Sequence, residues 1–410
     1  MTQSPFEPIE SCKTGRVIGH MRGEVDGPTI LFFGGIHGNE DSGVKALEKL
    51  FSELDSHRDK LKGNVFAIRG NIPALEEERR FLENDLNRIW TSRGIDSITT
   101  KEVSERNSEE DELVELHSII SDILSTYSPP YYFIDYHTTS SPTLPFITIN
   151  DALINRKFAR LFPVPIILGI EEYLEGPLLS YINEKGFVAI GFESGQHHTE
   201  AAVRNSNAFS WLVLRFTGAL PSGIVPVEEY YSLLKNEARQ NNSFYEIIHR
   251  HLIKEDDKFE MLPGFRSFDT IPEGTRLASH NGKQLHTDKK SVVFMPLYQE
   301  QGEDGFFLIR KIPKWILKLS SAVRMVRFDS FLTFLPGINW ASPKKDKLIV
   351  NLKVARFFSK PFFHLMGYRS RTVDETHMLM NNRERTSRKK MYRGTAWYRK
   401  NPLRNAGDLS

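Results

Sequence analysis

Cysteine is almost absent from this chain of 410 residues, in which Cys12 is the only one. A single cysteine excludes a disulfide within the chain and a metal cluster built on several thiolates. Long apolar runs are missing as well, because no stretch approaches the roughly 20 residues that a transmembrane helix needs. The first residues, MTQSPFEPIESCKTG, lack the basic start and the apolar core of a secretory signal. The sequence therefore predicts no transmembrane segment and a cytoplasmic location.

A large net charge is also absent, but the small value hides an asymmetry. The formal net charge is +2, from 54 Lys and Arg against 52 Asp and Glu. Residues 311–410 contain 22 Lys and Arg against 6 Asp and Glu, which leaves 32 against 46 in the first 310 residues. Two parts of such different charge indicate a boundary near residue 310.

The first 220 residues alternate between strand-like and helix-like segments. Apolar runs such as TILFFGG, NVFAIRG, YYFIDYH and FVAIGFESG indicate buried strands, and segments with helical spacing lie between them. This alternation is typical of an α/β fold with a mostly parallel central sheet and helices on both faces. We expect this domain to cover residues 1–225, followed by a polar helical connector over 226–262, a small β domain over 263–312 and a basic C-terminal extension over 313–410.

Polar side chains with metal-ligand chemistry follow three of these predicted strands. His37 and Glu40 lie in the glycine-rich stretch GGIHGNE, His137 ends the strand FIDYH, and Glu193 lies in GFESG. The carboxyl ends of parallel strands meet at one edge of an open sheet, where ligands bind. Imidazole and carboxylate are zinc ligands, and a catalytic zinc keeps three protein ligands and one open position. Glu193 is then a free carboxylate suited to act as a general base.

Each of these residues has an ordinary interpretation when it is taken alone. A His and a Glu on a loop are commonly solvated, and a lone His at a strand end is more often structural. The coincidence of four such side chains at the ends of separate strands is what favours a metal site. Asn87 and Arg88, in LENDLNRIW, add an amide beside a guanidinium, whose planar fork binds a carboxylate through two hydrogen bonds. Their ordinary interpretation is a capped helix start with an exposed Arg.

Four stretches of the chain match the motifs of a known family. They are GGIHGNE, NIPALEEERRFLENDLNR, DYHTT and GPLLSYINEKGFVAIGFESGQH, in the family's order and at comparable spacing. With them the chain resembles the succinylglutamate desuccinylase/aspartoacylase family, which is related to the zinc carboxypeptidases. The resemblance covers about residues 28–220. The segment up to about residue 311 matches the family only in its pattern of short β-like runs and turns, and the last hundred residues have no counterpart in the resemblance.

The resemblance implies a zinc-carboxypeptidase-like α/β/α sandwich. It also implies a zinc-dependent amidohydrolase that cleaves the amide of a small, anionic N-acyl amino acid. For the site it implies one zinc ion per chain, a catalytic carboxylate and a substrate clamp: His37, Glu40 and His137 for the zinc, Glu193 as general acid and base, and Asn87 with Arg88 for the substrate carboxylate.

Two positions depart from the family's pattern. The family usually has Pro directly after the Asn, whereas NIPAL has an Ile between them, and two Arg stand where one Arg followed by an aromatic is expected. Phe81 keeps the aromatic. Residues for a carboxylate on the acyl side are not visible by motif, and we interpret the two adjacent His as a solvated pair. The candidates are Arg69, Arg79, Arg80, His197 and His198.

Two other functions are compatible with the sequence. A metallocarboxypeptidase that acts on peptide C-termini would use the same chemistry with a different pocket. A non-catalytic scaffold would bind an anionic surface through the basic extension, although a scaffold has no need of a complete ligand set together with Glu193.

The C-terminal extension mixes aromatic and basic residues, as in KVARFFSKPFFHLMGYRSR and NNRERTSRKKMYRGTAWYRK. Such a mixture suits phosphate contacts and base stacking, or an anionic membrane surface. No recognised nucleic-acid motif is present, which speaks against nucleic-acid binding. We expect the aromatics to pack against the body of the protein with the charges solvated, and contact with a protein or an anionic surface is the alternative. The aromatics in question are Phe357, Phe358, Phe362 and Phe363.

Overall fold

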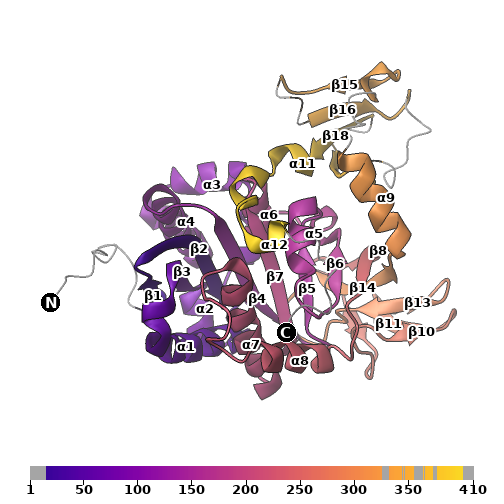
Figure 1. The fold of residues 1–410 in the computed structure, drawn as a ribbon. Coiled ribbons are helices and arrows are strands. Elements are labelled where there is room, and N and C mark those ends of the chain that lie inside the picture. Colours follow the sequence, from indigo (N-terminus) through magenta and orange to yellow (C-terminus); the bar gives the residue numbers. More distant parts are fainter. Residues whose placement is uncertain are drawn as a thin grey trace.

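The computed structural model describes residues 15–325, 332–343, 345, 347–354, 363, 365–372 and 376–399. A large sheet of eleven strands lies at its centre, in the order β1-β3-β2-β4-β7-β5-β6-β8-β14-β13-β10 (Figure 1). The strands of this sheet are β1 (Val17–Arg22), β2 (Val25–Gly34), β3 (Lys62–Arg69), β4 (Tyr131–Thr139), β5 (Phe146–Ile149), β6 (Ile166–Leu168), β7 (Val188–Gln196), β8 (Phe244–Leu252), β10 (Thr270–Ile271), β13 (Ser291–Phe294) and β14 (Asp304–Lys311).

Four parallel strands, β3, β2, β4 and β7, form the part of the sheet that carries the site. Each is an apolar run, and β4 is buried along its whole length. A strand that is covered on both faces carries apolar residues at nearly every position, whereas a strand with one wet face alternates. The runs TILFF and YYFID therefore become central strands, and the predicted mostly parallel sheet is confirmed.

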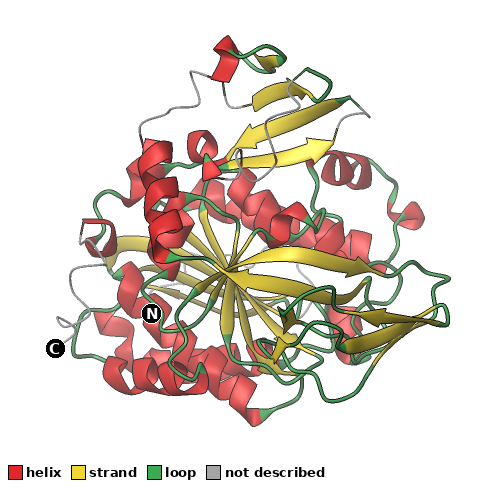
Figure 2. Cartoon of the chain, turned by 90° about the vertical axis from the view of Figure 1, so that its right-hand side faces the viewer, coloured by secondary structure: helices red, strands yellow, loops and turns green. Residues whose placement is uncertain are grey.

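Helices cover both faces of the sheet (Figure 2). One face packs against α1 (Ser42–Leu54), α5 (Leu153–Ala159), α7 (Glu200–Thr217) and α8 (Val227–Glu237), and the other packs against α3 (Ser92–Thr99), α4 (Ser108–Thr126) and α6 (Leu178–Glu184). Helix α4 begins with a capping box, in which Asn107 and Glu110 each accept a hydrogen bond from the other's backbone N–H. Among the helices of the described residues, none combines the length and the apolar character that crossing a bilayer requires.

The predicted helical connector is only partly helical. Helix α8 covers its first part, but Phe244–Leu252 forms β8, which pairs with β6 and β14 in the central sheet. The stretch FYEIIHRHL is rich in residues that favour strands, and its pairing with distant strands decides its structure. The predicted β segment after residue 262 continues the same sheet through β10, β13 and β14, and adds a three-stranded sheet of β9 (Phe259–Met261), β11 (Arg276–His280) and β12 (Lys283–His286).

The basic extension contains a second folded unit. Helix α9 (Lys314–Met325) leads to a four-stranded sheet in the order β15-β16-β18-β17, drawn at the top of Figure 1. Its strands are β15 (Ile338–Trp340), β16 (Lys347–Asn351), β17 (Tyr368–Thr372) and β18 (His377–Asn382). Leu348, Met380 and Phe363 are buried in the core of this sheet, so Phe363 packs within the extension, whereas the prediction placed it against the body of the protein. Phe357, Phe358 and Phe362 lie outside the described residues.

After this sheet the chain returns to the α/β unit through α11 (Arg383–Thr386) and α12 (Ala396–Arg399). Tyr392 and Trp397 are buried in the same core as the central strands. The Tyr392 hydroxyl accepts a hydrogen bond from the Val188 N–H at 2.8 Å and donates to the Tyr131 carbonyl at 2.6 Å, which joins the starts of β7 and β4. The aromatic residues at this end of the chain therefore belong to the core of the α/β unit.

Several charges of the basic extension are paired inside the protein. Arg324 lies 2.7 Å from Asp151 and 3.4 Å from Glu384, and Arg383 lies 2.8 Å from Glu171. The expectation that the charges of the extension are solvated is wrong for these residues, because they face carboxylates, of which Asp151 and Glu171 belong to the acidic first part of the chain and Glu384 to the extension itself. Ion pairs between the basic extension and the acidic first 310 residues therefore hold these two parts of the chain together.

Replacement of Tyr392 by Phe should destabilise the fold, because it leaves the Val188 N–H and the Tyr131 carbonyl buried without a partner. We expect the free energy of unfolding in urea to fall by about 1–3 kcal/mol. Tyr398→Phe is the matched control, since Tyr398 uses the face of its ring against the Lys157 ammonium. Equal urea midpoints for wild type and Tyr392→Phe would show that the hydroxyl does not join the two strands.

Candidate metal centre and substrate pocket

Three neighbouring parallel strands bring the predicted site residues together at their carboxyl ends. His37 and Glu40 lie on the loop after β2, His137 lies near the end of β4, and Glu193 lies in β7 opposite His137 in the strand register. All four side chains are buried. The fold thus collects residues that lie far apart in the chain.

Two glycines allow the loop after β2 to reach this position. Gly35 has a φ angle of +75°, in the left-handed region that favours glycine. A Cβ atom on Gly38 would lie 2.1 Å from the carbonyl group of Ala74, in helix α2 (Ile72–Glu76). The sharp turn and the close approach to α2 together place His37 and Glu40.

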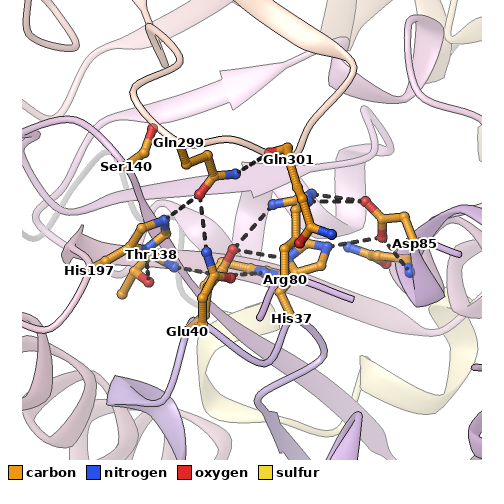
Figure 3. Close-up of polar contacts among 12 residues, drawn as sticks. His37, Glu40, Arg80, Asp85, Thr138, Ser140, His197, Gln299 and Gln301 are labelled. Atoms are coloured by element: carbon orange, nitrogen blue, oxygen red, sulfur yellow. Dashed lines mark hydrogen bonds and ion pairs between the residues drawn. The ribbon is translucent and has the colours of Figure 1, made fainter. Parts of the chain in front are cut away.

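The Glu40 carboxylate lies between two imidazoles (Figure 3). Its Oε1 lies 2.9 Å from Nδ1 of His37, and its Oε2 lies 3.0 Å from Nδ1 of His137. One donor atom from each of the three residues lies within 4.8 Å of the other two. Two imidazole nitrogens and a carboxylate that converge in this way could hold zinc or a similar divalent metal ion.

Two further carboxylates determine which nitrogen of each imidazole faces Glu40. Nε2 of His37 lies 3.0 Å from Oδ1 of Asp85, and Nε2 of His137 lies 2.8 Å from Oδ2 of Asp135. A carboxylate accepts the Nε2 proton, which leaves the Nδ1 lone pair of a neutral imidazole for a metal ion. The donor set therefore fits a metal ion in its residue types and in the direction of its lone pairs.

Sequence analysis did not identify Asp85 or Asp135. Asp135 stands two residues before His137, and Asp85 opens the stretch DLNR. Both belong to motifs that were recognised, so a search for a carboxylate to orient each ligand His would have pointed to them.

Burial and charge act in opposite directions on the carboxylates of this cluster. Burial alone would raise the pKa of Glu40, but the imidazoles of His37 and His137 overcome it and hold that pKa well below its ordinary value. Burial would also raise the pKa of Asp85, and the guanidinium of Arg80, followed by His37, holds it well below. Both carboxylates are therefore ionised at neutral pH and supply negative charge for a cation.

Glu193 differs from the other carboxylates of the site. Its side chain is buried, and its Oε2 has no hydrogen-bond partner among the residues that the structure describes. Burial raises the pKa of Glu193 to about 8, although the nearby His137 acts against the shift. A carboxyl group that titrates near neutral pH can take up and release a proton during a reaction.

Asn87 and Arg88 line the same pocket as the cluster. Asn87 accepts a hydrogen bond at Oδ1 from the Leu178 N–H at 2.9 Å, which ties it to the start of α6. The Arg88 guanidinium lies between two carboxylates, 3.5 Å from Asp304 and 3.9 Å from Asp85. Arg88 is therefore a positive group held at the pocket wall, and Asn87 also has a structural contact.

The candidates for a second substrate carboxylate divide into two groups. Arg80 and His197 line the pocket, whereas Arg69, Arg79 and His198 are not among its lining residues in the described part of the chain. Arg80 reaches the cluster, with Nη1 3.5 Å from Oε1 of Glu40 and Nη2 3.0 Å from Oδ2 of Asp85. Arg80 therefore touches the metal-ligand set itself.

The loop between β13 and β14 lies over the cluster (Figure 3). Gln299 accepts hydrogen bonds at Oε1 from Nδ2 of Asn39 at 3.1 Å and from Nε2 of His197 at 2.9 Å. Nδ1 of His197 forms a hydrogen bond with the Thr138 hydroxyl at 2.6 Å. Sequence analysis missed Gln299, and the interpretation of a solvated His pair holds for His198 and fails for His197, whose two ring nitrogens are both bonded.

A buried carboxylate at the start of α4 holds the loop that precedes residues 85–88. Glu109 accepts hydrogen bonds from the backbone N–H groups of Leu82 at 2.7 Å, Glu83 at 3.1 Å and Asn84 at 3.1 Å. These three contacts determine the path of the chain just before the site residues.

Comparison with known proteins agrees with this arrangement. A family model described as the succinylglutamate desuccinylase/aspartoacylase catalytic domain matches residues 26–198. Succinylglutamate desuccinylase from Photorhabdus laumondii is 40% identical over 65 residues, which are 16% of this chain and 20% of that protein. The enzyme of the same name from Pseudomonas paraeruginosa is 37% identical over 68 residues, 17% of this chain and 20% of that protein. The chain spans about a fifth of the length of these curated relatives.

Solved structures share the fold. Succinylglutamate desuccinylase from Vibrio parahaemolyticus aligns with a TM-score of 0.51 and 15% identity, over 70% of this chain and 83% of that chain. A succinylglutamate desuccinylase/aspartoacylase from Rhodobacter sphaeroides aligns with a TM-score of 0.53 and 15% identity, over 72% and 88%. Residues 26–198, which carry His37, Glu40, His137 and Glu193, are therefore similar to the catalytic domain of the succinylglutamate desuccinylase/aspartoacylase family.

Proposed function

We propose that this chain is a zinc-dependent hydrolase that cleaves the amide bond of a small N-acyl amino acid. The observation that carries the proposal is the orientation of the two imidazoles, which present Nδ1 to the Glu40 carboxylate and give Nε2 to a second carboxylate. The names of the relatives, desuccinylase and aspartoacylase, support amide hydrolysis as the reaction.

Zinc would be held by Nδ1 of His37, by the Glu40 carboxylate and by Nδ1 of His137. When bound, it would supply a Lewis acid that polarises the amide carbonyl and acidifies water. Asp85 and Asp135 would keep the imidazole rings in the orientation that leaves Nδ1 free for the ion.

Glu193 would act as general base and then as general acid. It would take a proton from the attacking water and give it to the leaving nitrogen, so that water adds across the amide and a carboxylic acid and an amine are released. Its buried position opposite His137 and its Oε2, unpartnered among the described residues, support this role. A pKa raised by burial to about 8 suits a group that must both accept and donate a proton.

Two guanidinium groups would bind the negative charges of the substrate and of the transition state. Arg88, with the Asn87 amide beside it, would bind the substrate carboxylate through its planar fork. Arg80 lies 3.5 Å from Glu40, so it would donate to the oxygen on which negative charge develops as the amide carbon becomes tetrahedral.

The loop over the pocket favours a small substrate over the C-terminus of a peptide. Gln299 bonds to Asn39 and His197, and Nε2 of Gln301 donates to the Phe81 carbonyl at 3.2 Å. A peptide that extends from the cleaved bond would have to displace these contacts. The metallocarboxypeptidase alternative is therefore less well supported than the deacylase, although the bond-breaking chemistry is shared.

Removal of both imidazoles should abolish metal binding. We expect wild-type protein purified without chelator to contain about one zinc per chain and His37→Ala/His137→Ala to contain close to none, because a single carboxylate is a poor ligand set. Elemental analysis of the two proteins measures this, and His198→Ala, which changes an exposed His outside the cluster, serves as the control. Full zinc content in the double variant would end the assignment.

Replacement of Glu193 by Gln should separate catalysis from metal binding. The variant keeps the size of the side chain and should retain zinc, but it cannot accept a proton from water. The rate should fall by roughly 10² to 10⁴, the range for general acid–base catalysis. Turnover is measured with an N-acyl amino acid that wild type hydrolyses, and a variant with unchanged kcat would leave Glu193 a structural role only.

Replacement of Arg88 by Lys should weaken catalysis on substrates that carry a carboxylate. Lys keeps the positive charge but lacks the planar fork. Loss of a charge-assisted hydrogen bond of about 1.5–3 kcal/mol corresponds to roughly tenfold to a hundredfold in kcat/KM.

The control for Arg88 is the same substrate with its carboxylate converted to a neutral amide. It should be poor for wild type and insensitive to Arg88→Lys. If wild type hydrolyses the acid and its neutral amide equally well, Arg88 does not bind the substrate carboxylate.

A further inference from the structure

Positive charge is limited in the pocket and already engaged. Among the lining residues that the structure describes there is no lysine, and the two arginines are Arg80 and Arg88. Arg80 lies 3.0 Å from Asp85 and 3.5 Å from Glu40, and Arg88 lies 3.5 Å from Asp304. One of these guanidinium groups is needed for one substrate carboxylate and the other lies against the metal ligands. Neither remains for a second carboxylate.

His197 does not supply a further positive charge. Its Nε2 donates to Oε1 of Gln299, and its Nδ1 lies 2.6 Å from the Thr138 hydroxyl, so both ring nitrogens are already engaged. Gln299 Oε1 can only accept, and Asn39 also donates to it, so the direction of the His197 bond is determined. Burial lowers the pKa of His197, in agreement with the neutral form.

The remaining charged groups of the pocket wall are carboxylates. Apart from Glu40 and Glu193, the described lining includes Glu171, Glu303 and Asp304. Each of them faces a guanidinium, Arg383 for Glu171, Arg250 for Glu303 and Arg88 for Asp304, and none supplies a cation for an anionic group on the substrate. A substrate with two or three carboxylates would therefore meet an unfavourable electrostatic environment.

Apolar side chains from two parts of the chain line the pocket. One group comes from the segment around α6 and the other from β14 and the loop before it. The first group contains Ile170, Leu174 and Leu179, and the second contains Met295, Leu297 and Phe307. Such a wall stabilises buried methyl and methylene groups, and it would leave a buried carboxylate without a partner.

On the basis of the proposed deacylase function, we propose that the substrate is an N-acyl amino acid with a single carboxylate, which Arg88 binds, and with an uncharged alkanoyl group that lies against the apolar wall. Hydrolysis then breaks the amide C–N bond, adds hydroxyl to the acyl carbon and hydrogen to the nitrogen, and releases a monocarboxylic acid and an amino acid. Succinyl conjugates, which the relatives' name indicates for those proteins, are excluded from the preferred class.

Binding to the zinc-loaded Glu193→Gln protein tests the substrate class without relying on turnover. The ligands are N-acetyl-L-leucine and N-butanoyl-L-leucine, with one carboxylate, and N-succinyl-L-leucine and N-acetyl-L-aspartate, with two. We expect calorimetric Kd values at least tenfold lower for the first pair. Because burial raises the pKa of Glu193 to about 8, Glu193→Gln leaves the charge of the pocket near pH 7 almost unchanged. Equal or tighter binding of a dicarboxylate, or binding of none of the four, overturns the proposal.

A change of charge on the wall tests the position of the acyl group. Leu297→Arg should bind N-succinyl-L-leucine at least tenfold more tightly than the unchanged protein, whereas Leu297→Gln, polar but uncharged, should not. Leu174→Arg, which changes a residue of the other apolar group, is a second variant in case Leu297→Arg does not fold. If neither Arg variant improves binding of the succinyl ligand, the acyl group does not lie against this wall and the proposal fails.

Hydrolysis by the wild-type protein distinguishes this inference from the function on which it rests. If the monocarboxylates bind tenfold more tightly and wild type hydrolyses none of them, the deacylase function fails and the charge preference of the pocket stands. If wild type hydrolyses N-succinyl-L-leucine faster than N-acetyl-L-leucine, the deacylase function stands and the substrate class proposed here fails.

Discussion

The Glu40 carboxylate is the group on which the rest of the site depends. It is buried between the imidazoles of His37 and His137, and its Oε2 also accepts a hydrogen bond from the Thr138 N–H at 2.9 Å. A buried carboxylate without such partners would be costly. Strands β2 and β4 provide them because they are parallel neighbours whose carboxyl ends lie side by side. The order of the central strands is thus what makes this buried charge tolerable.

Ion pairs extend outward from Glu40, with guanidinium and carboxylate groups alternating along the series. Arg80 lies 3.5 Å from Glu40 and 3.0 Å from Asp85, Arg88 lies 3.9 Å from Asp85, and Asp304 lies 3.5 Å from Arg88. The series starts at the loop after β2 and ends on β14, near the other side of the central sheet. Each member faces more than one opposite charge, as Asp85 does with Arg80 and Arg88 and Asp304 with Arg88 and Arg250, so the pairs compensate one another as a network. Through Asp304, the β segment after residue 262 is therefore connected by ion pairs to the His37–Glu40–His137 cluster.

Local patterns explain what could be predicted from the sequence. The apolar runs of β2, β4 and β7 marked the central strands, and His37, Glu40 and His137 stand at or just after the ends of such runs. Partners that are distant in the chain left no comparable signal. Strand β8 is defined by its pairing with β6 and β14, and Gln299 meets Asn39 across 260 positions. The aromatic and basic tail was ambiguous for the same reason, since only the folded structure shows which of its side chains have a buried partner.

The contact between Trp397 and Tyr132 has a consequence for the synthesis of this protein. The indole Nε1 donates to the Tyr132 hydroxyl at 2.9 Å, and the two residues are 265 positions apart. At the usual ~5–20 residues per second, the ribosome adds Trp397 roughly 10 to 50 s after Tyr132. Throughout this interval the Tyr132 hydroxyl lacks the indole donor that it has in the folded protein. This contact therefore forms only after β4, β7 and the helices that follow them in the chain have been synthesised.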